Sequence, residues 1–65
     1  MEIKPEDLGK RCLLKFGEDY ISGILMRFVD ERIEVQYNES FKHGDTTLTR
    51  VRNNTFLPSE IMKIL

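Results

Sequence analysis

Residues 20–30, YISGILMRFVD, decide the fold that this sequence predicts. The segment is too long and too apolar on both faces to form one flat strand. Gly23 lies inside it, where a β-bulge or a sharp bend needs a residue without a side chain. We therefore predict a bent strand that serves two sheets.

Strands with alternating apolar and polar residues are predicted on both sides of this segment. Lys10–Phe16 follows a period of two and ends at the turn-forming Gly17-Glu18-Asp19. After the bent strand, Asp30-Glu31-Arg32 closes a tight hairpin into Ile33–Tyr37, whose odd-numbered residues are apolar. Ile33–Tyr37 has the clearest pattern of a half-buried strand in the chain.

A long loop and a fourth strand are expected next. Asn38–Asp45 is polar and contains Gly44, so it is predicted as the longest loop, the kind of segment in which binding residues tend to lie. Thr46–Arg52 is rich in β-branched residues and predicts a fourth strand. We expect Asn53-Asn54 to stop this strand.

The two ends of the chain predict short elements. Met1–Gly9 is a lead-in that forms at most one helical turn, because Pro and Gly delimit it. Phe56–Glu60 is a turn that contains Pro, and Ile61–Leu65 is a short fifth strand. The alternative is a helix over Leu57–Leu65 with Ser59 as its cap, which its short length disfavours.

Composition places the chain among ordinary globular domains. It has 65 residues, of which 40% are hydrophobic and 32% charged. We expect residues 1–65 to form a single domain, near the lower size limit for a core without disulfides or metal. The formal net charge of −1 lacks the basic excess of dedicated nucleic-acid binders.

Cysteine content and hydropathy predict a cytoplasmic protein that does not enter the membrane. Cys12 is the single cysteine and cannot form an internal disulfide, and the sequence has no signal peptide. The longest uncharged run, Tyr20–Met26, is far shorter than the ~20 apolar residues of a membrane helix.

The order of these segments resembles the Src-homology-3-like barrel family, which includes Tudor, chromo-like, KOW and Sm-like domains. Two pieces carry the resemblance: residues 57–65, LPSEIMKIL, are similar to the closing turn and last strand, and residues 20–25, YISGIL, to the Tudor and KOW pattern. The resemblance implies an all-β fold, a small five-stranded, strongly bent Src-homology-3-like barrel. It has a short N-terminal turn and one helical turn before the last strand.

Two binding modes of that family lack their motifs in this sequence. The opening Ala-Leu-Tyr-Asp-Tyr motif and the groove Trp of proline-peptide binders are absent. A methyl-lysine cage needs several aromatic residues, and Tyr20, Tyr37 and Phe41 are the candidates. We therefore expect neither proline-rich ligands nor a complete cage.

Catalytic chemistry has few candidate residues. Cys12 and His43 form the one conceivable pair of nucleophile and base. Cys12 lies on the apolar face of its strand and is interpreted as a small core residue, and His43 as a solvated loop residue that could contact a ligand. No residue pattern suits a metal or a cofactor, and we predict that the protein is not an enzyme.

Arginine and tyrosine side chains supply the predicted binding surface. Arg50 and Arg52 project from one strand face, about 6 to 7 Å apart, and arginines so placed can bind phosphate or carboxylate oxygens. The alternative is a solvated face, or an edge strand protected by charge. A tyrosine at a barrel rim can stack on a base, an arginine or a proline, although packing is its more common role. The predicted ligand-binding residues are Tyr20, Tyr37, Phe41, His43, Arg50 and Arg52.

Three functions fit this surface. The first is a non-enzymatic adaptor that binds a protein partner through the loop and the basic strand, with a regulatory or inhibitory accessory protein as one form of this function. The second is a KOW-like or Sm-like nucleic-acid-binding domain. The third is a virus-type accessory protein that oligomerises and sequesters an anionic nucleotide between subunits, since so small a barrel has exposed edges and little pocket volume.

Overall fold

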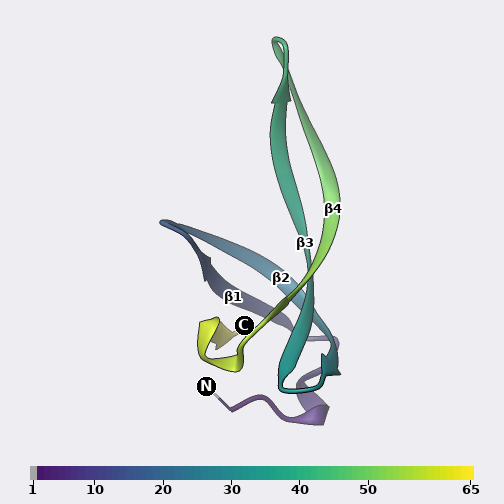
Figure 1. The fold of residues 1–65 in the computed structure, drawn as a ribbon, viewed down its shortest axis with the longest axis vertical. Helices are drawn as coiled ribbons and strands as arrows, with labels where there is room; N and C mark the ends of the chain where they lie inside the picture. Colours follow the sequence, from purple (N-terminus) through teal and green to yellow (C-terminus); the bar gives the residue numbers. More distant parts are fainter. Residues whose placement is uncertain (1) are drawn as a thin grey trace.

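Five antiparallel strands form one bent sheet, in the spatial order β4-β3-β2-β1-β5 (Figure 1). The structure is a computed structural model and describes residues 2–65. The strands are β1 (Arg11–Phe16), β2 (Asp19–Val29), β3 (Arg32–His43), β4 (Thr46–Phe56) and β5 (Ile61–Ile64). Two three-residue 3-10 turns, η1 (Pro5–Asp7) and η2 (Pro58–Glu60), precede β1 and β5. The all-β prediction, with its N-terminal turn and its helical turn before the last strand, is confirmed.

The core lies on one face of this sheet, hereafter the core face, and the opposite side is the outer face. Burial along β3 alternates and identifies this face, because Ile33, Val35 and Tyr37 are all buried while their neighbours along the strand are not. The full buried set is Cys12, Leu14, Leu25, Ile33, Val35, Tyr37, Phe56 and Ile61. Every strand contributes at least one member, so the core joins the whole sheet.

The β-bulge, one of the two predicted roles of Gly23, does not form at this residue. Gly23 pairs in regular register with Cys12 on β1 and with Tyr37 on β3. The β-bulge lies further along β2, where the register with β3 shifts between Leu25 and Arg27. A Cβ atom on Gly23 would lie 2.5 Å from Cγ1 of Val35. The missing side chain therefore permits close approach of two strands, rather than a bulge.

The prediction of a long loop over Asn38–Asp45 is wrong. β3 continues to His43, the turn contains only Gly44 and Asp45, and β4 begins at Thr46. Gly44 has φ +66°, a conformation that favours glycine and suits a two-residue hairpin turn. The segment lacks alternating apolar residues and was therefore predicted as a loop, but a strand exposed on both faces needs no such alternation.

β4 also extends further than its predicted end. Asn53 and Asn54 do not stop the strand, and its pairing with β3 runs from His43–Thr46 to Ile33–Phe56 without a register shift. Asparagine disfavours strands only weakly, and eleven consecutive backbone pairs override that preference. The result is one hairpin that is much longer than the rest of the molecule.

The sheet divides into two hairpins beyond Gly23 and Tyr37, the last pair that joins β2 to β3 in this direction. From there the β1–β2 hairpin and the β3–β4 hairpin diverge, as Figure 1 shows. The far part of the β3–β4 hairpin, residues 38–51, is called the ribbon below. Because the ribbon projects from the body, the molecule measures 42 Å along its longest axis and 21 Å and 20 Å along the others.

The C-terminal segment is not a helix, so the alternative for Leu57–Leu65 is wrong. Pro58 begins the three-residue turn η2, and Ile61 then places its side chain in the core as β5 pairs with β1. The backbone N–H of Leu57 donates to the carboxylate of Glu60 at 3.1 Å, which holds the turn. Among the described residues, no helix has the length and apolar character to cross a membrane.

The close approach at Gly23 predicts a large effect of a small substitution. Gly23→Ala places a methyl group 2.5 Å from Val35 Cγ1 and 2.7 Å from the carbonyl oxygen of Gln36. We expect it to lower the free energy of unfolding by about 1 to 3 kcal/mol, the usual cost of overpacking. Urea unfolding measures this loss. Ser22→Ala, at the exposed neighbouring position, is the control, and equal stability of the two variants would contradict the packing argument.

Candidate functional site

Five of the six predicted binding residues lie on one face of the β3–β4 hairpin. Register pairs Tyr37 with Arg52, Phe41 with Leu48, and His43 with Thr46, and these alternate residues all point to the same side. This side continues the core face. The side chains of the ribbon on this side, together with Arg52 opposite Tyr37, are hereafter the ribbon face, which comprises Glu39, Phe41, His43, Thr46, Leu48, Arg50 and Arg52.

Glu39 holds both arginines of the ribbon face. Arg50 donates from Nη2 and Nε to Oε1 of Glu39, at 2.8 Å and 3.2 Å. Nη1 of Arg52 lies 3.5 Å from the second carboxylate oxygen, Oε2. Glu39 is directly opposite Arg50 in the strand pairing, which explains why the contact forms. Both arginines therefore pair with a carboxylate, while their side chains remain 52% and 39% exposed on an edge strand, the setting that the alternative interpretation considered.

The ion pairs also change the pKa of Glu39. The hydrogen bonds from Arg50, and the positive charges of Arg50 and Arg52, lower the pKa of the Glu39 carboxyl below its ordinary value. Glu39 is thus ionised at neutral pH and neutralises part of the positive charge. A phosphate group would have to compete with this carboxylate for the same donors.

Phe41 gives the ribbon face an apolar component. The Cζ atom of Arg50 lies 4.9 Å from the centre of the Phe41 ring, within the range of a cation–π interaction. Leu48 is directly opposite Phe41 and 41% exposed. One side of the ribbon therefore combines a planar cation, an aromatic ring and an aliphatic side chain.

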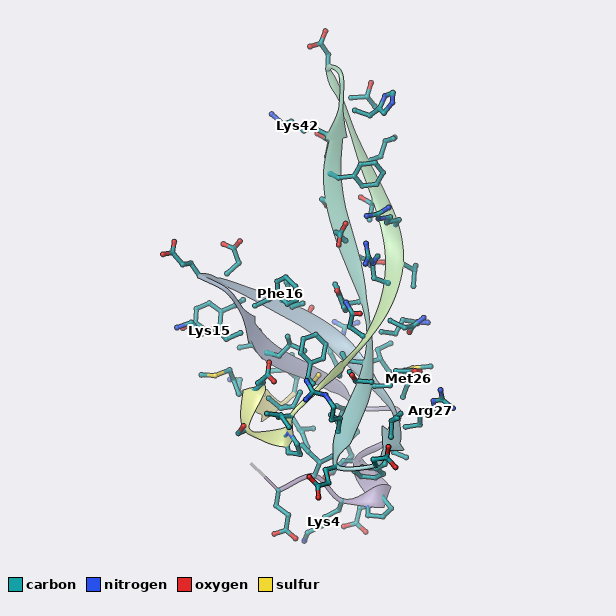
Figure 2. The ribbon with its side chains drawn as sticks, in the orientation of Figure 1. Lys4, Lys15, Phe16, Met26, Arg27 and Lys42 are labelled. Atoms are coloured by element: carbon teal, nitrogen blue, oxygen red, sulfur yellow. The ribbon has the colours of Figure 1, made fainter. Side chains whose placement is uncertain are left out.

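Tyr37 belongs to the core, which is the packing role considered for it. Its side chain is only 6% exposed. The rings of Phe16, Tyr37 and Phe56 lie with their centres 6.2 Å apart in each pair, and Phe16 lies in the angle between the two hairpins (Figure 2). The Tyr37 hydroxyl accepts a hydrogen bond of 2.6 Å from Nδ2 of Asn54. Its ring is thus committed to packing.

Tyr20 and His43 occupy separate places. Tyr20 is 59% exposed on β2, opposite Lys15 on β1. Successive side chains of β2 point to opposite faces, and Tyr20 is three residues before Gly23, which is on the core face. Tyr20 is therefore on the outer face and away from the ribbon face. β2 and β3 are neighbours, as the sequence predicted, but Tyr20 and Tyr37 are on opposite sides of the sheet. His43 is exposed at the end of the ribbon.

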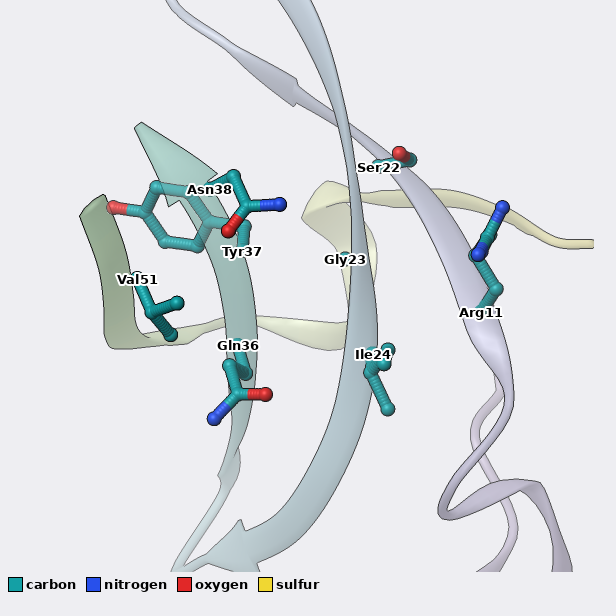
Figure 3. A pocket seen from close by; sticks show the side chains of 8 residues that line it. All are labelled: Arg11, Ser22, Gly23, Ile24, Gln36, Tyr37, Asn38 and Val51. Carbon is teal, nitrogen blue, oxygen red and sulfur yellow. The ribbon is translucent and has the colours of Figure 1, made fainter. Parts of the chain in front are cut away.

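A shallow hollow of about 220 Å³ lies on the outer face, across β1, β2, β3 and β4 (Figure 3). Its polar lining includes Arg11, Ser22, Gln36 and Asn38, and Val51 of the ribbon closes one side. These groups can donate hydrogen bonds to a carboxylate or a small polar group. The hollow and the ribbon face are on opposite sides of the sheet, so they do not form one site.

The conceivable catalytic pair is not brought together. Cys12 is fully buried in the core, and burial raises the pKa of its thiol. His43 lies six residues beyond the last β2–β3 pair, about 20 Å along the strand. Cys12 is a core residue, as predicted. In residues 2–65, no three His, Cys, Asp or Glu side chains form a group that could hold a metal.

Glu39 and Leu48 are functional candidates that the sequence argument missed. Their signal was the dipeptide Gly44-Asp45, which is a known two-residue hairpin turn. Pairing outwards from this turn places Phe41 opposite Leu48 and Glu39 opposite Arg50. The assumption of a long loop removed that register from consideration.

Comparison with family models, with curated proteins and with solved structures gives no match to this chain. In the part of the chain that the structure describes, the fold is a small, strongly bent, five-stranded antiparallel sheet that is not closed by hydrogen bonds.

The ion pairs of Glu39 predict a pH-dependent contribution to stability. Because folding lowers the pKa of Glu39, its contribution is present above the ordinary value of 4.5 and is lost as the pH falls through the lower, folded value. We expect Glu39→Gln to lower the melting temperature at about pH 7 and to have a smaller effect at about pH 3, because the wild-type carboxyl gains protons as the pH falls below its ordinary pKa. Thermal unfolding at low salt measures both.

The same substitution at Glu34 is the matched control. Glu34 pairs with Arg27 at 3.3 Å in the body of the sheet, and away from the ribbon. Its loss is expected to leave the Arg50 and Arg52 resonances in a nuclear magnetic resonance spectrum unchanged. Equal loss of stability by Glu39→Gln at both pH values would contradict the assignment.

Proposed function

We propose that this protein is a non-enzymatic interaction module that binds a protein partner through its ribbon. The projection of the ribbon from the body carries the proposal. Residues 38–51 pair only within their own hairpin, so Leu48 on the ribbon face remains 41% exposed. Maintaining such a projecting hairpin with apolar side chains on its surface is typical of an interaction element.

The composition of the ribbon face favours a protein over a nucleic acid. Aromatic residues and arginine are the types enriched at protein interfaces, and here Arg50 lies over the Phe41 ring. Nucleic-acid binding relies on cations that can reach phosphates, whereas Glu39 already engages Arg50 and Arg52. The net charge of −1 supports the same choice.

The proposal has three narrower parts: the structural superfamily, the cellular role and the location. Membership of the Src-homology-3-like superfamily is supported by the five strands and by the turn η2 before the last of them. An accessory or inhibitory role, of the virus type or another, is compatible with a module that presents one docking element. We propose the cytoplasm as its location on the basis of the single, buried cysteine.

A photo-crosslinking residue in place of Leu48 tests the proposal. In extract of cells that express the protein, we expect it to capture one partner species that unlabelled wild-type protein displaces. A second variant that adds Phe41→Ala should reduce this capture by roughly tenfold, since truncated aromatic anchors commonly cost more than 1 kcal/mol of binding.

Met62 is the matched control position, because it is 50% exposed on β5, at the other end of the sheet order. The same crosslinker there should not capture the partner. Equal capture from both positions, or no displaceable species from Leu48, would refute docking through the ribbon.

A further inference from the structure

The outer edge of β4 has no strand beside it. In the described residues β4 is the last strand of the sheet, and its only partner is β3. The edge runs over Thr46–Phe56 without a bulge or a proline. Natural proteins usually protect a long edge with such features or with charged side chains, or cover it with another element. The charged residues of β4, Arg50 and Arg52, pair with Glu39 on the ribbon face, so the outer face of this edge carries only uncharged side chains: Thr47, Thr49, Val51, Asn53 and Thr55.

Backbone groups along this edge point outwards at every second residue. The two residues that flank a two-residue hairpin turn form a hydrogen-bonded pair, which here is His43 with Thr46. Alternation from this pair directs the N–H and C=O groups of Thr47, Thr49 and Val51 away from β3. A strand placed beside β4 would therefore find a regular row of donors and acceptors.

The ribbon also lacks the third strand that an independent sheet needs. Its two strands continue beyond the last β2–β3 pair, and an isolated two-stranded hairpin is at best marginally stable in water. An additional strand on the β4 edge would supply both hydrogen bonds and side-chain contacts. A partner strand on this edge would thus stabilise the ribbon.

We propose that the β4 edge pairs antiparallel with the β4 edge of a second copy of this chain, in a register centred on Thr49. This register places Thr49 opposite itself and Thr47 opposite Val51 of the second copy. All three are β-branched residues on the outer face, which pack well across paired strands. The edge is therefore complementary to itself, which a two-fold dimer requires.

Charge selects this register among those centred on the ribbon part of β4. A centre at residue 50 or 51 places an arginine directly opposite an arginine of the second copy, which is destabilising. A centre at Thr49 places Arg50 opposite Leu48 and Arg52 opposite Thr46, and pairs residues 46–52 of each chain. A centre at Leu48 also separates the arginines but pairs a shorter segment.

The other edge of the ribbon is a poorer site for a second copy. Within residues 2–65, β3 has no neighbour on the β2 side beyond Tyr37, and Asn38, Ser40 and Lys42 are the residues whose backbone groups point there. This edge is shorter, has no β-branched residue and contains Lys42, and lysine commonly protects edges.

The dimer contact uses backbone at the β4 edge, whereas the proposed partner site uses side chains of the ribbon face. Neither proposal therefore depends on the other.

A charge-exchange experiment tests the dimer and its register together. Thr49→Lys and Thr49→Glu each place like charges opposite each other at the two-fold axis. We expect sedimentation equilibrium to show wild-type dimers, and each variant alone to dimerise about fivefold or more weakly. An equimolar mixture of the two variants should recover association as a mixed dimer. Thr49→Ala, which adds no charge, is the control and should remain dimeric.

Hydrogen exchange supplies a second measurement that does not depend on substitution. In the wild-type chain, the amides of Thr47, Thr49 and Val51 should become more protected as the protein concentration rises, while the amide of Leu48 already pairs with β3. Wild-type protein that stays monomeric, with these three amides unprotected at every concentration, would overturn the proposal. So would variants that dimerise alone as tightly as their mixture, because that result excludes the Thr49 register.

Discussion

The contact of β2 with β3 at Gly23 is the constraint on which the rest of this structure depends. The two strands approach so closely there that a single methyl group would meet Val35 and the backbone of Gln36. Gly23 is paired on both sides, with Cys12 and with Tyr37, and thereby connects β1, β2 and β3 through two residues of the core. Beyond this pair the sheet divides, so the same position marks where the ribbon begins.

The ribbon face extends the core face with a change in chemistry. Along β3, the buried Val35 and Tyr37 are followed on the same side by Glu39 and Phe41. Beyond Tyr37, no other strand in residues 2–65 packs on this side of the hairpin, so apolar residues are no longer required. An ion pair and a cation–π contact take their place. These contacts are local to the hairpin. They give the two strands a defined arrangement in a part of the molecule that has no core of its own.

The candidate site could be predicted only in part from the sequence. Arg50 and Arg52 were placed on one strand face by simple alternation, and this is correct. Their engagement by Glu39 could not be seen while residues 38–45 were treated as a loop, because the contact depends on strand register. Tyr37 was predicted in two roles, and its burial against Phe16 and Phe56 decided between them. That decision depends on residues far apart in the chain.

The sequence by itself determined the number of strands, the proline turn before the last one and the burial of Cys12, because local periodicity and turn chemistry report these features directly. It also identified Gly23 as special. Only the tertiary structure decided that Gly23 serves a close approach, that the hairpin extends to Gly44 and Asp45, and that the β4 edge is unpaired. The physical reason is that polar strands, strand register and free edges are defined by backbone pairing between distant segments, which leaves little trace in side-chain hydropathy.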